Sequence, residues 1–144
     1  MRKDGFFTGN RAMLRVKVTG AARSAHLNLA IDTCADPAVI LSEAWATHLD
    51  LMPEAAGDAT LADGSKAKTQ EGLAEIEWAG GSQLLYITIF PGTETGVGPN
   101  LDGLPQRGGQ PNGLAGHELL AQGRLTIDYI NQTVSLEAAS EKGA

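Results

Sequence analysis

The stretch from Leu29 to Val39 constrains the fold of this 144-residue chain more than any other part of it. It begins as an apolar strand, delivers a single carboxylate at Asp32 into a tight turn, and then enters another short apolar run. Such runs, bounded by polar turn residues, are typical of buried strands. The sequence therefore predicts two short strands that hold one carboxylate in the loop between them.

Composition favours one domain made of strands and turns. Apolar residues make up 42% of the chain and charged residues 19%, which lies within the globular range. Aromatic residues are scarce at 5%, whereas 18 residues are glycine, so small side chains are available where backbones cross. We expect a single domain over residues 1–144, with a core of about 13–137 and a frayed tail at 138–144.

Alternating apolar residues predict most of the strands. In the first of them, Leu14, Val16 and Val18 are expected to face inward and Met13, Arg15 and Lys17 outward. The other strands are predicted at 26–31, 39–41, 69–78, 84–90, 114–115, 125–129 and 133–136.

Turn and capping residues predict the connections. Asp63-Gly64, Gly80-Gly81 and Asn131-Gln132 each indicate a hairpin. Ser42 is expected to cap a short helix over 43–49, and a second helix of one or two turns is expected after Gly116. We expect Pro53, Gly57 and Asp58 to close the unit that contains the first helix. Residues 91–113, rich in Gly and Pro, predict a long loop that is either mobile or functional.

Four of these segments occur in the order found in a known family. The elements are the Asp32-Thr33 loop, the hairpin at Asp63-Gly64, the strands near 73–78 and 84–90, and Leu114-Ala115-Gly116 before a short helix. In this order and spacing the chain resembles the retropepsin-like aspartic proteases over about residues 13–137. It is most similar to the single-domain prokaryotic type, whose sequences carry an Ala-Asp-Gly flap and a Gly-x-Glu-Leu-Leu helix start. Cys34 is a departure, because the family has glycine at that position.

The resemblance implies an all-β acid-protease fold: a closed-barrel-like half with a flap hairpin and one or two short helices, assembled as a homodimer. Peptide or protein substrates would be hydrolysed between Asp32 of two subunits, without a cofactor. Two carboxylates about 3 Å apart cannot both ionise cheaply, so one would take a proton from water while the other donates one to the scissile carbonyl. Thr33 would bond across the two-fold axis, and Ala35 fits the family pattern. Gly116 would let the strand at 114–115 pass close to the catalytic loop, where a Cβ would collide. The flap, which would close over an extended peptide, comprises Ala62, Asp63, Gly64 and Ser65.

Cys34 leaves alternatives open. The turn adapts and activity survives, the cleft narrows and selects small substrates, or catalysis is lost and a dimeric peptide- or protein-binding domain remains. A thiol enzyme that uses Cys34 is a further alternative, and it needs a base such as His26, His48 or His117. A small buried hydrophobe is the commoner role of a single cysteine.

Charge and residue spacing argue against other partners. A net charge of −6 without a Lys/Arg cluster would repel nucleic acid. No segment is apolar and long enough to span a bilayer, and the N-terminus lacks the apolar core of a signal peptide. One cysteine excludes an internal disulfide framework and suits a reducing compartment, so we expect a cytoplasmic protein. Three scattered histidines and one cysteine lack the spacing of metal ligands, so no metal site is expected.

Overall fold

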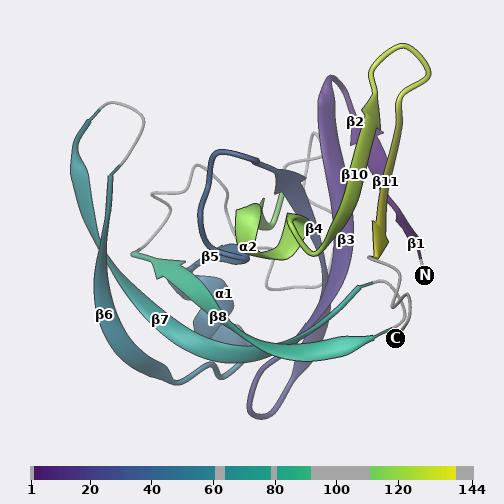
Figure 1. Ribbon diagram of the computed structural model, residues 1–144. Helices are drawn as coiled ribbons and strands as arrows, with labels where there is room; N and C mark the ends of the chain where they lie inside the picture. The colour runs from purple at the N-terminus through teal and green to yellow at the C-terminus, as the bar shows by residue number, and fades with distance from the viewer. Residues whose placement is uncertain (1, 61–63, 79–80, 92–110, 139–144) are drawn as a thin grey trace, which may run out of the picture.

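The computed structural model describes residues 2–60, 64–78, 81–91 and 111–138, which form a mostly β protein with two short helices (Figure 1). The strands are β1 (Arg2–Asp4), β2 (Phe6–Thr8), β3 (Arg11–Thr19), β4 (Ser24–Ile31), β5 (Val39–Ser42), β6 (Pro53–Thr60), β7 (Lys66–Glu77), β8 (Ser82–Phe90), β9 (Gly113–Ala115), β10 (Gly123–Asp128) and β11 (Thr133–Ala138). The helices are α1 (Glu43–His48) and α2 (His117–Leu120).

The strands form two sheets. A small antiparallel sheet has the order β1-β11-β10, and a large sheet has the order β2-β3-β4-β9-β5-β8-β7-β6. An additional pairing joins β3 to β7 through Val18 and Ile76, so the six strands from β3 to β7 in this order close into a ring. This closure agrees with the barrel-like sheet expected from the sequence.

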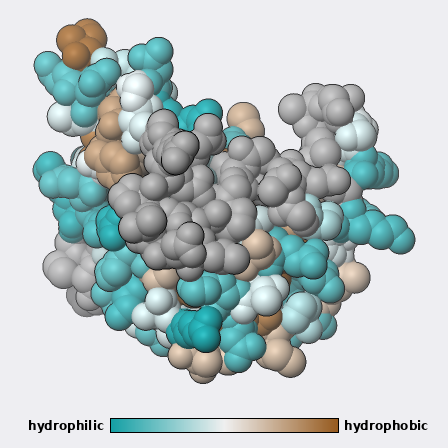
Figure 2. Space-filling view, turned by 180° about the vertical axis from the view of Figure 1, so that it is seen from behind, coloured by the Kyte–Doolittle hydropathy of each residue, from teal (hydrophilic) through white to brown (hydrophobic). Residues whose placement is uncertain are grey.

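The core lies inside this ring. Leu14, Val16 and Val18 are fully buried, as the alternation of β3 predicts. Trp45 of α1 packs into the same apolar cluster. On the surface, the face shown in Figure 2 is mostly hydrophilic where it is described, with apolar residues gathered at the projecting β10–β11 end and along the lower edge.

The outward placement of Met13 is wrong. Its side chain is only 1% exposed, whereas Arg15 on the same face of β3 is exposed. The reason is tertiary: β11 packs against β2 and β3 at this end of the strand, so both faces of β3 are covered around Met13. Alternation within one strand does not reveal this second layer.

The closing turn expected at Pro53, Gly57 and Asp58 is also wrong, because these residues lie in strand β6. β6 is an edge strand that pairs with β7 from Pro53 to Thr60. Only an edge strand readily accepts a proline, which has no N–H to donate. Its Ala-, Gly- and acid-rich sequence lacks the apolar alternation that marks a strand.

The antiparallel strand pairs expected on either side of the predicted turns are confirmed, and so is the predicted helix cap; Gly80 of the second turn lies outside the described residues. β6 and β7 pair up to Thr60 and Lys66, and Asp63 of the predicted turn lies outside the described residues. β7 pairs with β8, and β10 with β11, in antiparallel register. Ser42 caps α1, with its hydroxyl accepting a hydrogen bond from Trp45 N at 3.4 Å.

Two of the segments predicted from the sequence fall partly outside the described residues. Of the predicted loop 91–113, residues 92–110 are not described, and Gly113 belongs to β9. Of the predicted tail 138–144, Ala138 ends β11, and residues 139–144 are not described.

Candidate functional site

The loop that carries Asp32 connects β4 to β5, the two strands on either side of β9. β9 lies between β4 and β5, parallel to β4 and antiparallel to β5. Ala115 is the register partner of both Ile31 and Val39, so the two ends of the 32–38 loop leave the sheet on either side of one residue. In Figure 1 this loop is the dark blue connection that arches above β5 and α2. The topology therefore fixes where the Asp32 carboxylate emerges.

Backbone hydrogen bonds tie the loop to the segment that follows β9. Asp32 N donates to Ala115 O at 2.9 Å, and Gly116 N donates to Ala38 O at 2.9 Å. His117 N donates to Ala35 O at 2.6 Å. The first N–H groups of a helix have no partners within the helix, so the loop carbonyls satisfy donors that α2 would otherwise leave free.

Gly116 lies so close to the loop that only a hydrogen fits. A Cβ at this position would stand 2.0 Å from Pro37 O and 2.7 Å from Ala35 O. Both atoms belong to the backbone, so no side-chain rotation could make room. The close approach expected of Gly116 from the sequence is present.

The turn after Asp32 uses the backbone of Cys34. Cys34 N donates to Asp32 Oδ1 at 3.0 Å, and Ala35 N donates to Asp32 O at 3.2 Å. Asp32 is half-buried, whereas Thr33 and Cys34 are exposed. The loop thus holds one carboxylate oxygen in place and leaves the hydroxyl and thiol side chains at the surface.

The backbone of Cys34 is not in the left-handed region. Among the described residues, the non-glycine positions with positive φ are Asp50 and Gln132. The thiol is free and exposed, so the side chain does not enter the packed side of the loop. The backbone N–H of Cys34, and not its thiol, contacts the Asp32 carboxylate.

Of the predicted flap residues, the structure describes Gly64 and Ser65, which lie just before β7. Gly64 has a φ of +86°, a left-handed conformation that favours glycine, and an added Cβ there would meet no atom within 4 Å. The β6–β7 hairpin rises on the same side of the molecule as the 32–38 loop in Figure 1, to the left of it. The structure brings Asp32, Thr33, Cys34, Ala35 and Gly116 together; Ser65 lies beside Gly64, and Ala62 and Asp63 lie outside the described residues.

Asn112, which no pattern in the sequence singles out, joins the segment before β9 to β4 through two hydrogen bonds. Asn28 N donates to Asn112 Oδ1 at 2.9 Å, and Asn112 N donates to Asn28 O at 2.8 Å. Asn112 is only 8% exposed, although the sequence predicts that it lies in the loop at 91–113. The side-chain oxygen of Asn112 accepts a hydrogen bond from β4 as a strand carbonyl would. In the sequence, only the Asn-Gly dipeptide marks this position.

Within the described ranges, no group of three or more His, Cys, Asp or Glu side chains is placed to hold a metal ion. Nor does that part of the chain contain a helix with the length and apolar character needed to cross a membrane. No protein-family model matches the sequence, and no curated protein matches it.

Proposed function

We propose that this chain is one subunit of a homodimeric aspartic peptidase of the retropepsin type, with Asp32 of each subunit contributing one carboxylate to a shared site. The observation that carries the proposal is the passage of β9 between the two strands that flank the Asp32 loop. The resemblance implies that the strand before Gly116 lies close to the catalytic loop, and the 2.0 Å between a hypothetical Cβ and Pro37 O supports that relation.

The geometry of Cys34 supports retained activity over a disabled site. The function of the family glycine is to bring an N–H to the aspartate and to leave space in the cleft. Cys34 N lies 3.0 Å from Asp32 Oδ1, and the thiol is exposed. Of the three outcomes left open by the sequence, an adapted turn is therefore the one we favour.

The proposed chemistry needs two chains. One loop supplies one carboxylate, and a two-fold axis that passes between two copies of Asp32 supplies the second. The pair would share one proton, so that the charged carboxylate activates water and the neutral one protonates the scissile carbonyl oxygen. An extended peptide would pair with the β6–β7 hairpin by backbone hydrogen bonds.

Peptide cleavage, followed by mass spectrometry of a broad peptide mixture, tests the proposal. Asp32→Asn should lower kcat/KM by at least about a hundredfold, because an amide cannot exchange the proton. Asp36→Asn is the matched control: its exposed side chain lies in the same loop, and its backbone carbonyl would still accept from Glu118 N.

Other outcomes identify the alternatives. Unchanged cleavage by Asp32→Asn contradicts the proposal, and loss of that cleavage in Cys34→Ser would indicate a thiol enzyme. A dimer that cleaves no peptide, even as Cys34→Gly, would indicate a peptide-binding domain. Cleavage that appears only in Cys34→Gly would identify a disabled protease.

A further inference from the structure

A groove with a volume of about 240 Å³ lies on the outer side of β7 and β8, bordered by the β3–β4 turn and the segment after α1. Its apolar side chains are exposed: Met52 by 66%, Leu84 by 64% and Leu73 by 37%. Tyr86, the register partner of Leu73, extends this apolar surface. Neighbouring apolar side chains that remain in water commonly mark an interaction surface.

The outward direction of this surface follows from the strand period. Ala74 and Ile76 of β7 are buried in the ring, so Leu73 and Glu75 face the other way. Leu84 is the register partner of Glu75, which places an apolar and an acidic side chain side by side. The groove therefore has apolar and acidic side chains on one face of the sheet.

The rim of the groove is acidic. Asp50, Glu54 and Glu75 line it, and no Lys, Arg or His is among its described lining residues. None of these three carboxylates forms an ion pair within the described part of the chain. Arg23, in the adjoining turn, donates instead to His48 O at 3.4 Å. The negative charges thus remain available to a partner.

We propose that this groove binds a segment of another protein in which apolar side chains alternate with Lys or Arg. Burial of the apolar side chains would supply affinity, and the acidic rim would select the basic ones and speed association. A second copy of the chain that docks by the same groove is the wrong occupant, because the two acidic rims would face each other.

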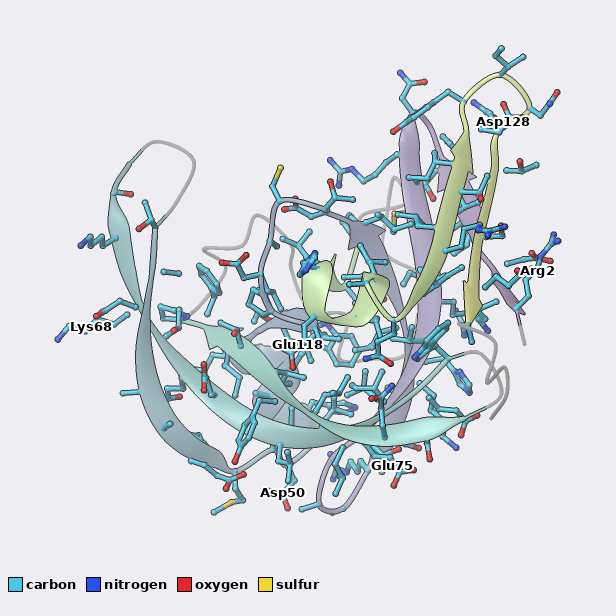
Figure 3. The ribbon with its side chains drawn as sticks, viewed as in Figure 1. Arg2, Asp50, Lys68, Glu75, Glu118 and Asp128 are labelled. Carbon is cyan, nitrogen blue, oxygen red and sulfur yellow. The ribbon has the colours of Figure 1, made fainter. Side chains whose placement is uncertain are left out.

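The groove is separate from the Asp32 loop. Figure 3 shows Asp50 and Glu75 at the lower edge of the molecule, whereas the 32–38 loop arches over its centre. No residue lines both. The proposed docking function therefore does not depend on peptidase activity, and Asp32→Asn should leave it unchanged.

Fluorescence anisotropy at low ionic strength, with a dye-labelled peptide of alternating leucine and arginine as the probe, tests the proposal. Leu84→Ser should weaken binding by about fivefold through the lost apolar contact, and Glu75→Gln by a similar factor. Ile130→Ser and Glu137→Gln are matched controls, because both side chains are exposed on β11 or the turn before it. These controls should bind the probe like the wild-type chain.

A charge exchange makes the test sharper. Glu75→Lys should narrow the preference for the leucine–arginine peptide over a leucine–glutamate peptide, although Asp50 and Glu54 keep the rim acidic. If a serine–arginine peptide binds as tightly as the leucine–arginine peptide, or if the control variants lose as much binding as the groove variants, the binding is non-specific charge attraction. Either result would overturn the proposal. Equal binding by every groove variant would mean that the probe is held elsewhere. A change in oligomeric state of Leu84→Ser in sedimentation would assign the surface to self-association instead.

Discussion

At Gly116 the side chain is a single hydrogen, and the loop that carries Asp32 depends on it. Gly116→Ala would place a methyl group 2.0 Å from Pro37 O, so the loop or α2 must move. We expect a loss of stability of about 3 kcal/mol, the upper range for an overpacked site. Chemical denaturation measures this loss as a lower midpoint with an unchanged slope.

Gly81→Ala is the control for that substitution. Gly81 has no positive φ, and a Cβ added there meets no atom within 4 Å. Its stability should stay within about 0.5 kcal/mol of the wild type. Equal effects of the two substitutions would show that the loop does not pack against Gly116 as described.

The side chain of Cys34 should contribute little to the proposed catalysis. Since its backbone N–H, rather than its thiol, contacts Asp32, Cys34→Ala should keep the proposed peptide cleavage within about threefold of the wild type. Steady-state kinetics on one peptide substrate checks this. Loss of cleavage in Cys34→Ala while Asp32→Asn stays active would contradict it.

Among the elements, the β10–β11 hairpin has a turn whose stability should depend on pH. Asp128 accepts hydrogen bonds from Asn131 N at 3.0 Å, from the Asn131 side chain at 2.8 Å and from Ile130 N at 3.0 Å. The Asn131 N–H contributes most to lowering the pKa of Asp128 below its ordinary 3.8, followed by the Asn131 side chain. The charged carboxylate is therefore the better cap for this turn.

A carboxyl group whose pKa is lower in the folded than in the unfolded protein stabilises the fold at pH values above its unfolded pKa. This stabilisation is lost as the pH falls through its folded pKa. Asp128→Asn should therefore lower the thermal midpoint at neutral pH, and the gap to the wild type should shrink below about pH 4. The same substitution at Asp58, whose side chain accepts no hydrogen bond in the described ranges, should give a small gap that stays constant. A gap at Asp128 that widens in acid would contradict the assignment.

The elements also show what a single sequence can predict. β3, β4 and β8 have strong apolar patterns, and Asp63-Gly64 and Asn131-Gln132 indicate the turns that precede β7 and β11, so these features could be located in advance. β6 could not, because its backbone pairing with β7 stabilises it rather than any apolar pattern. β1 and β2 are three residues each, too short for a period to be visible.

For the whole molecule, the closure of the sheet by the β3–β7 pairing depends on contacts between residues about sixty positions apart, which no local pattern encodes. The candidate site was partly predictable, because Asp32 and Gly116 follow from motif order. Asn112 and the groove beside Leu84 were not, since both depend on which strands become neighbours.

Mixing wild-type and variant subunits tests whether two chains contribute to one proposed site. Equilibration of the wild-type chain with about a ninefold excess of Asp32→Asn chain should leave about a tenth of the wild-type subunits in fully active dimers. Cleavage per wild-type subunit should fall by the same factor, since a mixed dimer has one carboxylate. Addition of Asp36→Asn chain in the same excess should not lower it.

The most direct measurement is the distance between the two Asp32 carboxylates in a crystal structure of the assembled protein. We expect a dimer in which the two carboxylates approach to about 3 Å across the two-fold axis, close enough to share one proton. Dimers that hold the two carboxylates far apart, or a protein that sediments as a strict monomer while it still cleaves peptides, would contradict it.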